Sequence, residues 1–276
     1  MPNGILIIDK PQDWTSMDVC ARLRRCLGER RIGHAGTLDP MATGVLPVFV
    51  GRATRAVEFA SEGQKEYLAG LRLGLVTDTQ DTSGAVLEER PAAVTPGELE
   101  AVLPRFRGPI QQVPPMYSAI KIQGKKLYEL ARQGKEVERR PRPVTIHALE
   151  LEDQLGPDEF LLRVRCSKGT YVRTLCHDIG AAVGCGGCMS SLRRTMAAGF
   201  TLADSVTLDA VLQADDPAAL LLPVDAYFSG YPDLVADPEQ EKRIRNGAAL
   251  PMPGLPDGRY RRLQGNRHGT LYLLPH

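Results

Sequence analysis

Long apolar runs are missing from this sequence, and their absence bears first on where the protein resides. The longest apolar stretches, such as residues 4–8 and 45–50, are far shorter than the roughly 20 residues that a membrane-spanning helix needs. The N-terminus also lacks the basic region and apolar core of a signal peptide. We therefore expect a cytoplasmic protein that does not associate with membranes.

Cysteine is also sparse, which limits disulfide and metal chemistry. Six cysteines in 276 residues, without a secretion signal, are interpreted as reduced thiols. Cys185 and Cys188 have the C-x-x-C spacing of metal or redox sites, but no second C-x-x-C or His pair completes a zinc site. The sequence therefore predicts no metal site.

Net charge is close to zero, at +1, so any nucleic-acid binding must depend on the segregation of charge. Residues 121–142 carry eight Lys or Arg against three Glu, a local net of +5, and residues 242–267 carry seven against one Asp, a local net of +6. Two basic clusters suit a long polyanion. A pair of solvated surface segments is the alternative interpretation.

Periodicity and capping signals predict an α+β fold with a mixed, largely antiparallel central sheet. Thr15 to Asp18 and Thr95 to Glu98 have the spacing of capping boxes. Residues 109–115, which are interrupted by prolines, are expected to form a loop. Strands are expected at 4–9, 45–50, 67–73, 85–89, 144–152, 159–166 and 191–195, and helices at about 15–27, 54–60, 95–106, 126–133 and 171–183.

The composition changes beyond about Tyr227, where Gly and Pro punctuate short segments. This pattern is typical of short strands and turns. We therefore expect two domains, a main domain at residues 1–226 and a small β-rich unit at residues 227–276. The 43% apolar content is ample for a core.

The most informative segment is 33–47, which reads GHAGTLDPMATGVLP. It places one carboxylate, Asp39, in a loop whose three glycines (Gly33, Gly36 and Gly44) and Pro40 permit backbone angles closed to most residues. The apolar run that follows is expected to anchor the loop as a buried strand. An Asx-turn before proline is the alternative interpretation of Leu-Asp-Pro alone.

This segment closely resembles the catalytic loop of the TruB family of tRNA pseudouridine synthases. The family pattern of Gly-His, Gly-x-Leu-Asp-Pro and Ala-Thr-Gly-x-Leu-Pro recurs residue for residue. Further family motifs follow in the family's order at residues 9–11, 65–67, 77–81, 115–121 and 167–174, so the resemblance covers roughly residues 4–210. It implies the pseudouridine synthase fold, and a small C-terminal unit similar to a PUA domain that contacts RNA.

The resemblance implies that Asp39 is the catalytic residue. Isomerising uridine moves the glycosidic bond from N1 to C5 with no redox change, so no cofactor is expected. Asp39 can attack C1′, add to the uracil ring or stabilise the charge of the departing base, and the sequence leaves these routes open. In the family, Arg173 is the cation that keeps the carboxylate ionised, and a planar guanidinium can hold it through two parallel hydrogen bonds.

Other positions match family residues that bind the substrate. Tyr67 is expected to stack on the flipped base, with core packing as the alternative. Tyr171 and Leu192 match positions that line the same pocket. His34 matches a histidine that wedges into the RNA loop. Lys10 matches a lysine near the active-site loop, with a structural role as the alternative. Lys121 is expected to bind phosphate, whereas Asp78 and Asp81 are expected to order their loop.

The leading hypothesis is therefore an enzyme that isomerises uridine-55 in the T loop of tRNA to pseudouridine, acting as a monomer without an obligate protein partner. Two alternatives remain at this point. One is a tRNA-binding or tRNA-folding factor in which catalysis is incidental, and the other is an N-glycosidase that uses Asp39 and releases free uracil. Product nucleosides from one tRNA transcript separate the three.

Overall fold

A mixed sheet of ten strands forms the centre of the structure, a computed structural model that describes the chain except for residues 123, 236, 247–259, 265–266 and 269–276. The strands are β1 (Gly4–Lys10), β2 (Ile32–His34), β3 (Thr43–Val50), β4 (Lys65–Leu73), β7 (Gly108–Gln112), β10 (Arg142–Gly156), β11 (Glu159–Cys166), β12 (Gly187–Ala197), β13 (Phe200–Thr201) and β14 (Val206–Thr207).

The sheet order is β14, β1, β3, β12, β4, β11, β10, β7, with β2 paired to β3 and β13 paired to β12. The pairings of β1 with β14 and of β3 with β12 are parallel, and the others in this sheet are antiparallel. The predicted mixed, largely antiparallel sheet is therefore confirmed.

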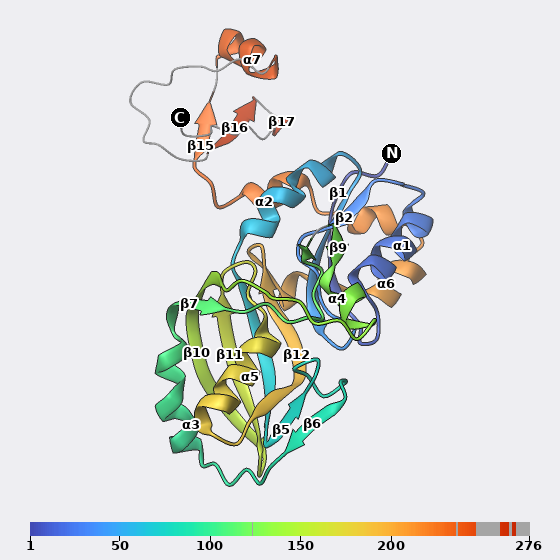
Figure 1. Cartoon of the computed structure of the whole chain (residues 1–276). Coiled ribbons are helices and arrows are strands. Elements are labelled where there is room, and N and C mark those ends of the chain that lie inside the picture. Colours follow the sequence, from blue (N-terminus) through green and yellow to red (C-terminus); the bar gives the residue numbers. More distant parts are fainter. Residues whose placement is uncertain (123, 236, 247–259, 265–266, 269–276) are drawn as a thin grey trace.

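Helices pack on this sheet through their apolar faces. Figure 1 shows α5 (Val172–Val183) and α3 (Pro96–Val102) near strands β10 and β11, and α1 (Ser16–Leu27) beside α6 (Leu208–Gln213) at the other end. All four helices contribute to the larger core. Shorter helical segments are η1 (Gly51–Ala56), α2 (Val57–Glu62), η2 (Leu103–Phe106), α4 (Leu127–Ala131), η3 (Leu202–Asp204), η4 (Pro217–Leu220) and η5 (Val224–Phe228).

The strand β1 is buried on both faces, which places the sheet between two cores. Leu6 and Ile8 point into the larger core, whereas Ile5 and Ile7 point into a second core. Because successive side chains of a strand alternate between faces, an unbroken apolar run is the expected sequence for such a strand.

Both predicted capping boxes are present at the starts of their helices. The Thr15 side chain accepts from the Asp18 N–H at 3.0 Å, and Gly28, directly after the last residue of α1, has a φ of +61°. The capping box at Thr95 begins α3 in the same way. The structure replaces the helix expected at 54–60 by the 3-10 segment η1 followed by α2.

The prediction of a loop at residues 109–115 is wrong for the first half of this range, because β7 spans Gly108–Gln112. Pro109 faces Thr145 of β10 in this strand. Since β7 lies at the edge of the sheet and pairs on one side, a residue without an N–H is tolerated there. The strands β10 and β12 are longer than expected, and the sequence analysis predicts none of β13, β14 and α6.

Two small hairpins lie outside the main sheet, formed by β5 (Leu75–Thr77) with β6 (Val86–Glu89) and by β8 (Lys121–Ile122) with β9 (Lys125–Lys126). The C-terminal region contains β15 (Asp233–Val235), α7 (Pro238–Arg245), β16 (Arg261–Gln264) and β17 (Arg267–His268), and Figure 1 draws it apart from the main sheet.

The predicted division at residues 226 and 227 stays a prediction. Of the second basic cluster, Lys242 and Arg243 are exposed on α7, and the remaining side chains lie outside the described residues. No helix in the described part of the chain is both long and apolar enough to span a membrane.

Candidate active site

The loop that carries Asp39 joins β2 to β3, and glycine is required at both of its ends. Gly36 has a φ of +92° and Gly44 a φ of +100°, a region that favours glycine. A Cβ on Gly44 would lie 2.2 Å from the carbonyl oxygen of Arg194. Ser16 of α1 fixes the middle of the loop, because its hydroxyl accepts from the Leu38 N–H at 2.8 Å.

Lys10 braces the same loop from within the protein. Its buried ammonium donates to the carbonyls of Pro11 (2.7 Å), Trp14 (2.6 Å) and Pro40 (3.2 Å). Burial lowers the pKa of Lys10 to about 8. The ammonium of Lys10 thus uses its three donors on three carbonyls, and Lys10 does not line the cavity. This geometry supports the structural alternative for Lys10.

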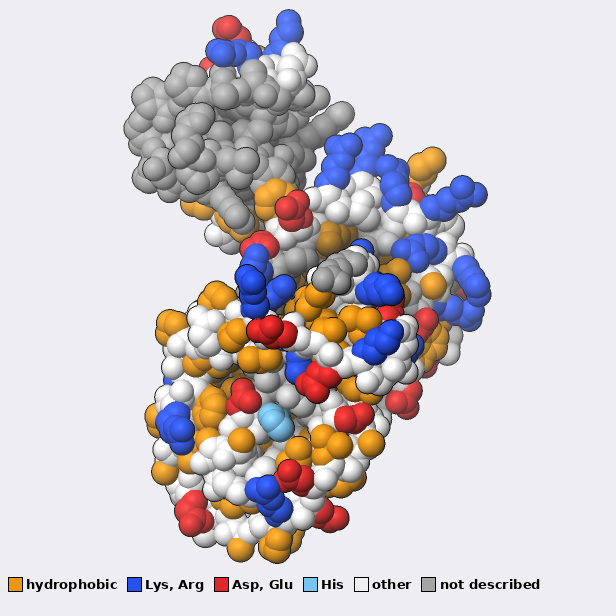
Figure 2. Space-filling model, viewed as in Figure 1, with side chains coloured by type: hydrophobic (Ala, Val, Ile, Leu, Met, Phe, Trp, Pro, Cys, Tyr) orange, Lys and Arg blue, Asp and Glu red, His pale blue; other side chains and the backbone are white. Residues whose placement is uncertain are grey.

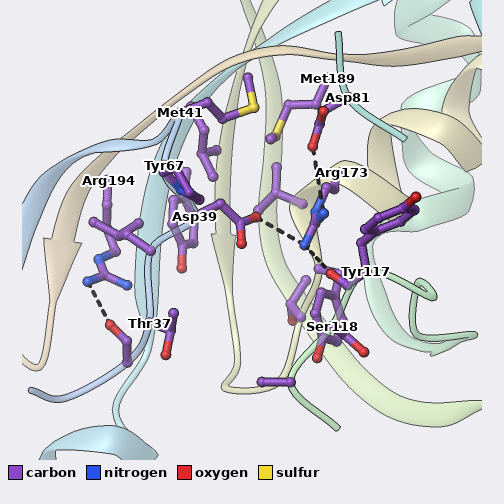
Figure 3. A pocket seen from close by; sticks show the side chains of 18 of the residues that line it. Thr37, Asp39, Met41, Tyr67, Asp81, Tyr117, Ser118, Arg173, Met189 and Arg194 are labelled. Carbon is purple, nitrogen blue, oxygen red and sulfur yellow. Dashed lines mark hydrogen bonds and ion pairs between the residues drawn. The ribbon is translucent and has the colours of Figure 1, made fainter. Parts of the chain in front are cut away.

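Arg173, on the first turn of α5, brings two carboxylates together. Its side chain is 8% exposed, and its Nη2 lies 3.1 Å from Asp39 Oδ2 while its Nη1 lies 3.6 Å from Asp81 Oδ2 (Figure 3). Nη2 also donates to the carbonyl of Tyr117 at 3.0 Å. The expected hold on Asp39 through two parallel bonds is therefore not what the structure has, because the guanidinium is shared between two acids.

Asp81 is the member of this group that the sequence did not assign to the site. Its carboxylate accepts from the Thr79 hydroxyl at 2.8 Å and the Ser83 N–H at 3.0 Å, so it does order its loop as expected. It also faces Arg173. The family motif at residues 77–81 was the available signal, but spacing alone does not show which distant cation an acid meets. Asp78 accepts from the Tyr117 hydroxyl at 3.2 Å.

Burial raises the pKa of Asp39 above its ordinary range, and Arg173 opposes this shift without overcoming it. The charge of Asp81 raises the Asp39 pKa further. Burial of the Asp39 carboxyl group is the largest of these effects on its pKa. Arg173 is therefore the main group that favours the ionised form of Asp39.

A cavity of about 780 Å³ opens over this group. Five of the predicted site residues line it, namely Asp39, Tyr67, Tyr171, Arg173 and Leu192. Figure 3 shows Met41 and Met189 near Asp39 and Arg173, which gives the ion pair apolar neighbours. The surface of the cavity is therefore mostly apolar, with the carboxylates of Asp13, Asp39 and Asp81 in its lining.

The two tyrosines are held in different ways. Tyr67 is buried in β4, and burial raises its pKa, which keeps its hydroxyl protonated. Tyr171 precedes α5, and the side chain of Gln112 in β7 bonds both its N–H (2.8 Å) and its carbonyl (3.0 Å). The unpredicted strand β7 thus positions a cavity residue.

His34 and Lys121 do not line the cavity. His34 ends β2, and burial lowers its pKa. Lys121 is exposed on β8, two residues after the lining residue Ala119. The sequence did not single out Tyr128 or Arg132 as cavity residues, yet both line it, and the Arg132 guanidinium carbon lies 5.5 Å from the centre of the Tyr128 ring.

Lys65 and Arg194 also line the cavity and were not assigned a role. Lys65 belonged to a family motif, and its ammonium donates to the carbonyls of Ser61 and Gly63, each at 2.6 Å. Nothing in the sequence distinguished Arg194 from its neighbour Arg193. Within the described residues, no cluster of His, Cys, Asp or Glu could hold a metal ion.

Comparison with known proteins identifies the class. Residues 24–172 match the profile of the TruB family pseudouridylate synthase N-terminal domain, and residues 173–229 match that of the tRNA pseudouridylate synthase B C-terminal domain. These matches define the class as a pseudouridylate synthase. The chain belongs to the TruB family, and it is a tRNA pseudouridine synthase, an isomerase.

Curated relatives and solved structures agree. The chain is 46% identical to tRNA pseudouridine synthase B of Ralstonia pickettii (strain 12J), over 96% of this chain and 85% of the relative. It is 43% identical to that of Clostridium kluyveri, over 90% and 85% of the two chains. A chain in the crystal structure of a Cbf5-Nop10-Gar1 complex has a TM-score of 0.72 and 29% identity, over 90% of this chain and 68% of that one. The α+β pseudouridine synthase fold is therefore confirmed.

Proposed function

We propose that this enzyme isomerises uridine-55 in the T loop of tRNA, with Asp39 as the catalytic carboxylate. The observation that carries the proposal is the partly exposed Asp39 carboxylate, 3.1 Å from the buried Arg173, at an apolar cavity beside Tyr67. A cation buried beside a carboxylate favours its charged form, as a nucleophile requires.

The reaction breaks the bond from N1 of uracil to C1′ and forms one from C5 to C1′, while C5 loses one proton and N1 gains one, either directly or by exchange with solvent. Asp39 can attack C1′ and let uracil leave with the electron pair, or add to the ring before the bond breaks. Both routes need the ionised carboxylate, and both balance without a cofactor. Arg173 supplies the charge that keeps Asp39 ionised when the base excludes water.

The remaining cavity residues suit a flipped base. Tyr67 offers an aromatic face on which a base can stack, and Tyr171 and Leu192 complete the walls. His34 lies outside the cavity, which is compatible with a contact to the RNA loop from which the base has left. Lys121 is exposed, as a phosphate ligand must be.

Exposed arginines add a basic surface that counting along the sequence did not reveal. Figure 2 shows Lys and Arg gathered over the end of the molecule that carries α1, whereas the lower half mixes both signs of charge. The Gly51 N–H donates to the Arg31 carbonyl at 2.8 Å, which brings η1 beside the loop after α1. The exposed arginines of α1, of the loop after it and of η1 are Arg22, Arg25, Arg30, Arg31, Arg52 and Arg55. This basic surface suits the sugar-phosphate backbone of a folded tRNA.

We extend the proposal to the C-terminal region. The small β-rich unit at residues 227–276 is PUA-like and grips RNA, while residues 1–226 carry the chemistry. The enzyme acts as a cytoplasmic monomer on the T stem-loop. Analytical ultracentrifugation with and without tRNA tests the monomer.

The test uses one tRNA transcript labelled with tritium at C5 of uridine. Isomerisation at position 55 releases tritium and yields pseudouridine, and a transcript with cytidine at that position should release none. Free uracil as the product would indicate the N-glycosidase instead. Altered tRNA folding without a change in nucleosides would indicate a binding factor.

Asp39→Asn assigns the catalytic residue. The amide keeps the shape of the side chain but not its charge, so the saturated single-turnover rate should fall by at least ~10³-fold while tRNA affinity stays within about threefold. Asp153→Asn, at an exposed carboxylate of β10, is the matched control and should keep the rate. A rate near that of the native enzyme would remove Asp39 from this role.

A further inference from the structure

Arg194 of β12 is a fully buried cation that forms no ion pair with a carboxylate in the described part of the chain. It is 1% exposed. Its Nε donates to the carbonyl of Val45 at 2.7 Å and its Nη2 to the carbonyl of Gly36 at 3.1 Å. Burying a charge without a counter-ion is costly, so the position calls for an explanation.

The two carbonyls that Arg194 holds lie on either side of Asp39 in the loop. Gly36 is three residues before the carboxylate, and Val45 is six residues after it. The backbone of Arg194 also pairs with Gly44 in the parallel contact between β12 and β3. One residue of β12 therefore fixes the beginning and the end of the catalytic loop, and Figure 3 draws its guanidinium beside Thr37 of that loop.

A fixed frame matters at the two ends of the loop, because Ser16 and Lys10 hold only its middle. Gly36 and Gly44 both have left-handed backbone angles, and glycine has many alternatives to them. Arg173 holds the carboxylate but not the loop backbone. Without a hold on both ends, the loop could carry Asp39 away from Arg173.

The shape of a guanidinium suits both contacts. Its Nε and Nη2 are separate donors in one rigid plane, so they can reach two carbonyls that are nine residues apart in sequence. A lysine ammonium at the end of a flexible stem keeps the charge but lacks this planar pair of donors. Charge and geometry can therefore be separated by substitution.

We propose that Arg194 is a positioning residue that clamps both ends of the loop from Gly36 to Val45 and so holds Asp39 in its productive place. This inference rests on the proposed role of Asp39. It assigns Arg194 no contact with the substrate.

The test measures single-turnover rates at saturating tRNA for Arg194→Lys and Arg194→Met, together with tRNA affinity. A displaced catalytic group costs on the order of 10²-fold in rate, so we expect a fall of roughly that size in Arg194→Lys with affinity within about twofold. Arg163→Lys, at a guanidinium on β11 that is bound to Glu152, is the matched control and should keep the native rate.

Hydrogen exchange provides a second measurement, which does not require Arg194→Met to fold. In folded Arg194→Lys, the amides of Leu38 and Ala42 should exchange faster than in the native enzyme, while amides in α5 should not change. If Arg194→Met fails to fold, Arg194→Lys and its exchange pattern decide alone. A native saturated rate in Arg194→Lys, a defect confined to tRNA affinity, or unchanged loop exchange would each overturn the clamp.

The clamp and the proposed function fail in different ways. An active Asp39→Asn enzyme refutes the role of Asp39, whatever Arg194 does. An inactive Asp39→Asn enzyme together with a native rate in Arg194→Lys leaves the function standing and refutes the clamp alone.

Discussion

Arg173 serves two carboxylates, and this sharing makes its contribution to stability separable from its contribution to catalysis. Replacement by methionine leaves Asp81, whose side chain is 5% exposed, without a cation. Removing one partner of a buried ion pair costs about 3–5 kcal/mol. Asp39 is 38% exposed, so solvent screens its charge and it adds no more than about 1 kcal/mol.

The expected loss is large on the scale of a whole protein. At roughly 2–4 °C for each kcal/mol, a cost of 3–5 kcal/mol lowers the melting temperature of Arg173→Met by about 6–20 °C. Adding Asp81→Asn should restore most of this loss, because the amide is neutral and needs no cation. Activity should stay lost in both variants, since Asp39 has no cation in either.

Thermal unfolding followed by circular dichroism measures the stability of both variants, and single-turnover kinetics at a temperature where both are folded measures the rate. Arg163→Met, which breaks a half-exposed ion pair with Glu152, is the control and should cost about 0–1 kcal/mol. A double variant no more stable than Arg173→Met would refute the idea that Asp81 is the stranded charge. Native stability in the single variant would show that the pair carries little energy.

Two further predictions concern pH and salt. Because burial raises the pKa of Asp39 more than Arg173 lowers it, the saturated rate should fall on acidification with a midpoint above the ordinary Asp value of about 3.9. Asp81→Asn should move that midpoint to lower pH, because it removes a negative charge that raises the Asp39 pKa. A midpoint that stays or rises in this variant would contradict the sharing of Arg173 by the two carboxylates. Binding of tRNA should weaken as the salt concentration rises. If Lys121 and Lys125 each contact one phosphate, replacing both by alanine should reduce the slope of log binding constant against log salt concentration by about 1.4–1.8. An unchanged slope would place both lysines away from the RNA.

Local signals predicted most elements of the fold but not their arrangement. The apolar run of β1 and the capping box at Thr15 are local, and both elements formed where expected. The position of β12 between β3 and β4 depends on pairing with strands more than a hundred residues away in the sequence. Local sequence patterns do not predict such pairings. The sequence around Pro109 predicts a loop, because a strand accepts proline readily only at the edge of a sheet and the local sequence does not show that β7 lies there.

The candidate site divides in the same way. The family motifs predicted Asp39, Tyr67, Tyr171, Arg173 and Leu192, and all five line one cavity. The motifs did not reveal that Arg173 also contacts Asp81 or that Arg194 holds the loop. In both cases the contact joins residues that are far apart in the sequence, and a motif match does not show which distant segments meet. Motif matching finds the groups that perform chemistry more readily than the groups that position them.

The partial exposure of Asp39 makes the role of Arg173 depend on the substrate. In the free enzyme, 38% of the Asp39 side chain still meets water, which helps to stabilise its charge. A base that fills the cavity removes that water, so desolvation rises while the distance to Arg173 need not change. The guanidinium must then stabilise the carboxylate almost alone. We therefore expect the loss of Arg173 to slow the chemical step with bound tRNA more than it alters Asp39 in the free enzyme.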